Sequence, residues 1–271
     1  MSIPLEDYYE DILGKAQRGL GLTDQQVCSR ADISEEKWKH ALDGKFDETT
    51  ARAVAPVLSL GADALVTCGK RAWKPDPVSV DGLRQCNTTF DDMTVNAYVV
   101  WNPRTRAAVV FDSGADARPL LDTVRERNLT VRQILLTHSH PDHVADLQGL
   151  RNAFPDAPIA IHRRETVTGA DPFEEGAVFE ADGLKIAARL TAGHSPGGAT
   201  FVIEGLERPV AIVGDALFAG SMGGAPSAWN SAIAATREKI LGLPENTVLC
   251  PGHGPLTTVA AELENNPLFA K

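Results

Sequence analysis

The chain has 271 residues, with 26 basic and 36 acidic side chains, so its formal net charge is −10 at pH 7. Hydrophobic residues make up 43% of the sequence and charged residues 23%, a composition that excludes wholesale disorder and is typical of a globular protein. The acidity argues against a dominant nucleic-acid surface, because phosphate binding needs clustered positive charge. The length suits one sizeable domain or a medium domain beside a small one.

Nothing in the sequence indicates export or membrane insertion. Residues 1–20 lack the basic start and the apolar run of a signal peptide. The longest apolar runs are far shorter than the ~18 residues that a membrane helix needs. The four cysteines form no CxxC pair, which favours reduced thiols. We therefore expect a cytoplasmic protein without a membrane partner.

Residues 1–70 are predicted to form a small helical domain. Thr23 and Gln26 make a capping box, in which the two side chains satisfy free backbone groups at the start of a helix. A further helix is expected to begin at Ser34. The charged, proline-containing stretch 71–79 is typical of a linker.

Residues 80–271 are predicted to form an α/β domain, because short β-rich runs alternate there with turns and helices. Apolar residues at helical spacing mark one helix between Val144 and Phe154 and another between Trp229 and Ile240. The strand candidates are 97–101, 107–111, 133–137, 158–161, 185–190, 199–203, 209–213 and 247–250.

The strongest chemical signal is a run of three histidines and one aspartate directly after a predicted strand. His138, His140, Asp142 and His143 lie within six residues, so they cannot share one face of a helix or a strand. They fit a tight turn that projects all four side chains into one pocket. Neutral imidazoles and a carboxylate suit Zn²⁺, Fe²⁺ or Mn²⁺. A set of unrelated surface histidines is a poor alternative for this spacing.

Three more candidate ligands, His194, Asp215 and His253, each follow the end of a predicted strand. Residues just past strand ends can meet along one edge of a sheet, where ligands usually bind. Glycines beside all three allow a close approach of the backbone. Seven ligands are enough for two metal ions, with open positions left for a shared water.

The order His-x-His-x-Asp-His, a lone His, a Gly-Asp and a Pro-Gly-His-Gly resembles the metallo-β-lactamase superfamily, and above all its glyoxalase-II-like (hydroxyacylglutathione hydrolase-like) branch. The stretches 214–221, 251–258 and 264–267 look like that branch, and 109–114 is similar to the early Asp-x-Gly turn of the superfamily. The resemblance implies an αββα metallo-β-lactamase sandwich over residues 80–268, here preceded by the small all-α domain.

The resemblance also implies the roles of the ligands. Asp142 would orient a metal-bridging hydroxide that acts as the nucleophile, and Asp112 would orient a ligand from outside the coordination sphere. Two divalent transition-metal ions are implied, zinc in the first place and iron or manganese as alternatives. The resemblance implies that His138, His140 and His194 bind the first metal ion. It implies that Asp142, His143 and His253 bind the second ion and that Asp215 bridges the two ions.

The implied reaction is hydrolysis of a thioester or a related acyl substrate, expected to be small and anionic. An alternative within the same branch is a mononuclear-iron persulfide dioxygenase, which uses fewer metal ligands. The family usually continues Gly-Ser-x-Gly-Arg-x-Asp after the bridging aspartate, whereas 220–226 lacks that Arg and Asp. This departure leaves the substrate open. Arg163 and Arg164 are weak candidates for receiving an anionic group, and a solvated charge pair is their alternative interpretation. His40 and His162 are expected to be bystanders.

Residues 10–66 resemble a helix-turn-helix domain of the Cro/repressor type, through 22–27, 31–34 and 62–65. Residues 1–70 hold 8 basic and 12 acidic side chains, a balance that phosphates would repel. We therefore expect a module that joins two copies of the chain or covers the active-site mouth, and no DNA binding. The alternative from another class is a DNA-binding regulator whose metal domain acts as a sensor.

Overall fold

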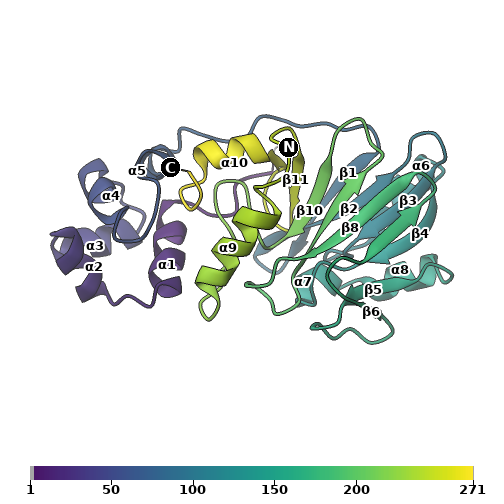
Figure 1. Cartoon of the computed structure of the whole chain (residues 1–271), viewed down its shortest axis with the longest axis horizontal. Coiled ribbons are helices and arrows are strands. Elements are labelled where there is room, and N and C mark those ends of the chain that lie inside the picture. The colour runs from purple at the N-terminus through teal and green to yellow at the C-terminus, as the bar shows by residue number, and fades with distance from the viewer. Residues whose placement is uncertain (1–2, 271) are drawn as a thin grey trace.

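The computed structural model describes residues 3–270 of the chain. Two six-stranded sheets lie face to face with helices on their outer faces, and a group of helices precedes them (Figure 1). This is the αββα sandwich with a helical segment before it that the sequence predicts. None of the described helices is long and apolar enough to cross a bilayer. The cytoplasmic location stays a prediction.

The first sheet begins as an antiparallel meander of three strands and continues with parallel pairs. Its outer face is covered by α6 (Arg118–Glu126) and α8 (Leu147–Ala153). The strands in order are β1 (Leu83–Phe90), β2 (Met93–Trp101), β3 (Ala107–Phe111), β4 (Thr130–Leu135), β5 (Ile159–His162) and β6 (Asp171–Phe173).

The second sheet is antiparallel from its first strand to its fourth, and the fourth and fifth strands pair in parallel. Its outer face packs against α9 (Trp229–Lys239) and α10 (Val259–Asn265). The strands in chain order are β7 (Val178–Ala181), β8 (Leu184–Leu190), β9 (Ala199–Glu204), β10 (Val210–Gly214), β11 (Val248–Pro251) and β12 (Thr257–Thr258).

Strand alternation separates the buried layers. On β3, Val109 and Phe111 enter the core between the two sheets, while Val110 packs outward against α6 and α8. On β10, Ile212 enters the same inner core and Val213 packs outward against α9. This two-residue period makes both sheets apolar on both faces, so both need a helical layer outside them.

Five short helices form the segment before the sandwich. The capping box at the start of α2 is confirmed, since the Gln26 backbone N–H donates to Thr23 Oγ1 at 3.2 Å and the Thr23 N–H donates to Gln26 Oε1 at 2.9 Å. Ser34 caps α3 in the same way. The helices are α1 (Tyr9–Gly19), α2 (Asp24–Ala31), α3 (Glu35–Leu42), α4 (Glu48–Val54) and α5 (Ala62–Gly69).

The helical segment and the sandwich share one apolar core. Leu13 of α1, Leu65 of α5 and Trp229 of α9 belong to a single buried cluster that reaches Val213 on the second sheet. In Figure 1, α9 and α10 lie between the N-terminal helices and the strands. Residues 72–80 have no helix or strand. The boundaries predicted at residues 70 and 80 stay predictions, but the two parts do not have separate cores.

Several elements depart from the sequence prediction. β1 is absent from the predicted strands because its eight residues are mostly polar, and it forms through pairing with β2 along its whole length. β4 ends at Leu135, two residues before the predicted end, which frees Leu136 and Thr137 to begin the loop with the histidines. The helix expected between Val144 and Phe154 is the shorter α8, and a separate helix that was not predicted, α7 (Pro141–Val144), precedes it.

Candidate metal centre

The candidate ligands meet at one edge of the sandwich, where strands of both sheets end. β4 leads into the loop with His138 and His140, and α7 adds Asp142 and His143 one turn later. β10 ends directly before Asp215. The loops after β8 and β11 complete the edge with the two remaining histidines. Strand ends therefore bring together residues up to 115 positions apart, from His138 to His253.

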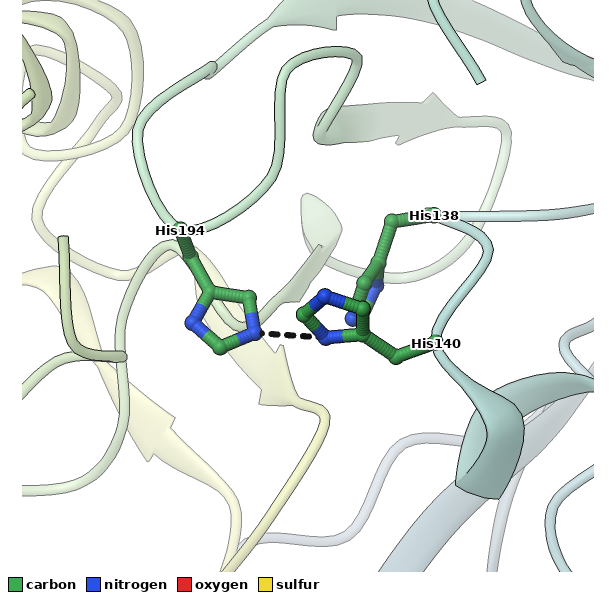
Figure 2. A group of neighbouring side chains, drawn as sticks. All are labelled: His138, His140 and His194. Atoms are coloured by element: carbon green, nitrogen blue, oxygen red, sulfur yellow. Dashed lines mark hydrogen bonds between the residues drawn. The ribbon is translucent and has the colours of Figure 1, made fainter. Parts of the chain in front are cut away.

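The first group of ligand atoms consists of His138, His140 and His194. Figure 2 shows the three rings converging, with His194 opposite the other two. His140 Nδ1 lies 2.9 Å from His194 Nε2. One nitrogen from each ring falls within 4.8 Å of the others, a spacing that one metal ion can bridge.

The second group consists of Asp142, His143 and His253. Asp142 Oδ2 lies 3.3 Å from His253 Nε2 and 3.5 Å from His143 Nε2. Asp215 lies between the two groups: its Oδ2 is 3.2 Å from His194 Nε2, and its Oδ1 is 3.3 Å from His143 Nε2. One carboxylate is thus within reach of both groups.

Hydrogen bonds on the outer side orient three of the rings. Nδ1 of His143 donates to Asp112 Oδ2 at 2.9 Å, that of His253 to the Thr94 carbonyl at 2.7 Å, and that of His194 to the Gly224 carbonyl at 3.1 Å. Since Nδ1 of each ring donates to one of these acceptors, Nε2 is the nitrogen that faces the centre of the site, where it can bind a metal ion once it carries no proton.

Asp112 also forms hydrogen bonds to Thr137, at the start of the histidine loop. Its φ of 57° is left-handed, which turns its carboxylate back toward the loop after β4. There Oδ1 accepts from the Thr137 N–H at 2.8 Å and Oδ2 from the Thr137 hydroxyl at 2.7 Å. The same residue therefore holds both His143 and the start of the histidine loop.

Unsatisfied polar atoms mark the centre of the site. His138 Nε2, His143 Nε2 and Asp215 Oδ1 are buried and make no hydrogen bond. Leaving three such atoms without partners would cost about 1–3 kcal/mol each. A Cβ at position 252 would lie 2.0 Å from Asp215 Oδ1, so Gly252 lets the backbone close tightly over the carboxylate. Orphaned donor atoms in a nitrogen and oxygen set of this kind fit a pair of divalent metal ions.

The histidines of the site differ in the direction in which their pKa values are shifted. Burial lowers the pKa of His138 to about 2, which keeps its imidazole neutral and ready to bind a metal. Burial also opposes a charge on His143 and His253, but neighbouring carboxylates outweigh it and raise the pKa of His143 to about 10 and that of His253 to about 11. Metal binding at those two rings therefore displaces protons.

The other sequence candidates lie outside these groups. Arg163 and Arg164 follow β5 on the surface, and Arg163 forms an exposed ion pair with Glu174. His40 is exposed, and His162 is buried edge-on against a phenylalanine ring and belongs to none of the metal groups among residues 3–270.

Sequence reasoning missed two acidic residues beside the site. Glu165 accepts a hydrogen bond from the Ser139 hydroxyl and another, at 2.7 Å, from the Gly197 N–H, so it ties the His140 loop to the His194 loop. Glu6 lies 3.9 Å from His253 Nδ1. No local pattern marks either residue, because each acts on partners far along the chain.

The fold and the site agree with the comparison with known families. A model of the metallo-beta-lactamase superfamily matches residues 90–253, and this chain belongs to that superfamily. All seven candidate ligands fall inside the match. The match begins at residue 90, so the helix-turn-helix resemblance of residues 10–66 stays a prediction.

Three similar proteins show the range of the family. Hydroxyacylglutathione hydrolase GloC of Haemophilus influenzae is 27% identical over 198 residues, which cover 64% of this chain and 92% of that protein. The crystal structure of the B3 metallo-β-lactamase BLEG-1 is 30% identical, with a TM-score of 0.62, and the match covers 70% of this chain and 100% of that one. TTHA1623, solved in a di-iron-bound form, is 29% identical with a TM-score of 0.54, over 67% and 98% of the two chains.

Proposed function

We propose that this metallo-hydrolase binds two divalent metal ions and cleaves a thioester or a related acyl substrate. The observation that carries the proposal is the presence of two adjacent ligand groups with a carboxylate between them. His138, His140 and His194 would hold the first ion, and Asp142, His143 and His253 would hold the second. Asp215 reaches both groups and would be shared between them.

When bound, two such ions would supply a hydroxide nucleophile at neutral pH and Lewis-acid polarisation of the substrate carbonyl. The chain supplies the geometry. The Asp142 carboxylate, 12% exposed, lies 3.3 Å from His253 Nε2 and would orient the attacking oxygen. Asp112 fixes the His143 ring through a hydrogen bond. Glu165 holds the His140 loop and the His194 loop together by accepting hydrogen bonds from both. No serine or cysteine nucleophile is needed.

The substrate class rests on the relatives. GloC is named a hydroxyacylglutathione hydrolase, which supports a thioester. BLEG-1 is named a B3 metallo-β-lactamase at 30% identity, which supports a β-lactam as the second candidate. The same attack on a carbonyl serves both.

The test is a hydrolysis panel with enzyme of known metal content. It contains S-lactoylglutathione, other acyl thioesters, lactones, β-lactams and phosphodiesters. We expect the highest kcat/KM for a thioester, with loss of the activity on chelation and its return on addition of metal. A preference for β-lactams contradicts the thioester assignment, and failure on every substrate by enzyme with two bound ions contradicts the proposed hydrolase.

The number of metal ions separates this proposal from the mononuclear-iron dioxygenase. Asp142, His143 and His253 bring their ligand atoms within 4.8 Å of one another, which supports a second metal position. Zinc is the proposed metal, and the di-iron form of TTHA1623 makes iron the first alternative. We expect two ions per chain in elemental analysis. One ion, together with oxygen consumption on glutathione persulfide, would favour the dioxygenase.

We propose no role in DNA binding. Glu35 and Glu36 lie in the first turn of α3, which would be the DNA-reading helix of a helix-turn-helix domain, and both are exposed. Fluorescence anisotropy with duplex DNA at low salt should show no binding. Binding that weakens steeply as the salt concentration rises would instead support the regulator.

A further inference from the structure

The loop between Asp215 and α9, residues 216–228, contacts three candidate metal ligands. The Gly224 carbonyl accepts the hydrogen bond from His194 Nδ1 at 3.1 Å, and the Gly223 N–H donates to the Asp215 carbonyl at 3.0 Å. The Phe218 ring packs edge-on against His253, with 5.4 Å between the ring centres. The position of this loop therefore affects both ligand groups and the carboxylate between them.

The loop cannot hold itself in place with charges of its own. Residues 216–228 contain no Asp, Glu, Lys or Arg. A Cβ at position 223 would lie 2.3 Å from the Asp215 carbonyl oxygen and 2.8 Å from His194 Nδ1, so the backbone approaches both ligands closely. The loop is fixed partly by its own paired backbone hydrogen bonds between Phe218 and Ser221 and partly by groups from other elements.

The N-terminal segment supplies two of these groups, Asp7 before α1 and Lys15 within it. The Ser221 hydroxyl donates to Asp7 Oδ2 at 2.7 Å, and Lys15 Nζ donates to the Met222 carbonyl at 3.0 Å. Asp7 and Lys15 also form an ion pair with each other, and Lys15 Nζ lies 5.2 Å from the centre of the Phe218 ring.

These contacts are shielded from solvent. The Asp7 side chain is 8% exposed, that of Lys15 is 17% exposed, and Ser221 is fully buried. Charged hydrogen bonds in such surroundings are stronger than on the surface, and the loss of one partner leaves the other charge unpaired in a buried place.

A second anchor holds the same loop from the sandwich side. Glu262 of α10 accepts from the Gly220 N–H at 3.0 Å, and Asn266 donates to the Ser221 carbonyl at 3.0 Å. These two contacts end at residue 221. The two anchors meet at Ser221, whose side chain is held by Asp7, and beyond it Lys15 holds the Met222 carbonyl, two residues before Gly224.

We propose that Asp7 and Lys15 are positioning residues of the metal centre, which fix the loop 216–228 and through it His194, Asp215 and His253. Both residues lie outside the superfamily match, which begins at residue 90, so the N-terminal segment adds a support that the matched part lacks. The inference relies on the metal centre of the proposed function, but it does not depend on the identity of the substrate.

Metal affinity is the direct test, measured on full-length protein by cobalt titration and by competition with a chelator. We expect Lys15→Met to weaken cobalt binding by about 10–100-fold, the usual effect of losing a group that orients metal ligands. The visible absorption of bound cobalt should also change. Lys15→Arg should restore most of the affinity, because it keeps a cation that can donate to the Met222 carbonyl.

Arg52→Met is the matched control. Arg52 forms ion pairs with Glu48 and Asp63 in the same helical segment, but its side chain is 47% exposed and lies outside the loop contacts. We expect its cobalt affinity and spectrum to equal those of the wild type. Equal affinities and spectra for Lys15→Met and Arg52→Met would overturn the proposal.

Ser221→Ala covers the case in which Lys15→Met does not fold. It removes only the hydroxyl that donates to Asp7, and we expect a several-fold loss of cobalt affinity with an altered spectrum. An unchanged affinity and spectrum would again overturn the proposal. Wild-type protein that binds two cobalt ions but hydrolyses no acyl substrate would contradict the proposed function and leave the positioning role to be decided by these variants.

Discussion

The sandwich and the N-terminal helices contribute to the site in different ways. The sandwich carries all seven candidate ligands, at strand ends along one edge, and the superfamily match at residues 90–253 covers most of it. The N-terminal helices carry no candidate ligand, yet their apolar side chains join the core outside the second sheet and Asp7 and Lys15 reach the loop behind His194. The sandwich therefore supplies the candidate ligands, whereas the N-terminal part supplies contacts to a loop behind them.

The largest expected effect concerns a ligand of the sandwich. Asp142→Ala removes the carboxylate that faces His143 and His253, so we expect kcat/KM to fall by at least about 10³-fold and the second ion to be lost while the fold survives. Kinetics, elemental analysis and circular dichroism measure the three quantities. Asp156→Ala, at an exposed aspartate in the turn between α8 and β5, serves as the control. Full activity with two ions in Asp142→Ala would contradict the assignment.

Glu262, which holds the loop 216–228 from the sandwich side, should make the free energy of unfolding depend on pH. Burial raises its pKa to about 7 although three hydrogen-bond donors oppose the rise. Since the folded-state pKa lies above the ordinary value of 4.5, the stability from Glu262 is complete below that value and is lost as the pH rises through about 7. The loss amounts to about 3 kcal/mol.

Denaturant unfolding between pH 5 and pH 8 measures this contribution. Relative to Glu262→Gln, which does not titrate, the wild-type protein should lose about 2 kcal/mol or slightly more of unfolding free energy over that range. Parallel pH profiles for the two proteins would show that Glu262 does not ionise in this interval.

The apolar contact between the two regions is tested by a pair of glycines in α1. A Cβ on Gly19 would lie 2.1 Å from the Trp229 ring of α9, so Gly19→Ala should destabilise the protein by about 1–3 kcal/mol through overpacking. On Gly14 a Cβ meets only the flexible end of Arg18, at 2.9 Å. Gly14→Ala should instead raise stability by about 0.5–1 kcal/mol through helix propensity.

Chemical denaturation of both variants compares them directly. The expected result is opposite signs within one helix. Equal effects of the two substitutions would mean that α1 and α9 can move apart without cost, and that the shared core is not a rigid support for the site.

The smallest effect is expected at Arg163, one of the weak substrate-binding candidates. Its guanidinium pairs with Glu174 on the surface, where such pairs contribute about 0–1 kcal/mol. Arg163→Ala should therefore leave kcat/KM within about twofold of the wild-type value. A tenfold rise in KM for an anionic thioester would show that this arginine contacts the substrate after all.

Local sequence predicts some strands of the sandwich and all the candidate ligands, for different reasons. The buried strands such as β3 and β10 are predictable because their apolar runs are continuous, whereas β1 is polar and becomes a strand only by pairing with β2. The ligand candidates are predictable because each histidine or aspartate stands beside a glycine or within a dense motif after a strand.

The sequence by itself determined the fold class, the superfamily and the set of candidate ligands, since these depend on short local motifs of recognisable chemistry. Only the tertiary structure decided what surrounds them. Glu165 acts on Ser139 and Gly197, and Asp7 acts on Ser221 across 214 positions of sequence. The Glu165 contacts form only when the fold of the sandwich brings two loops together, and the Asp7 contact only when the shared core packs the helices against the sandwich; no local pattern encodes either approach.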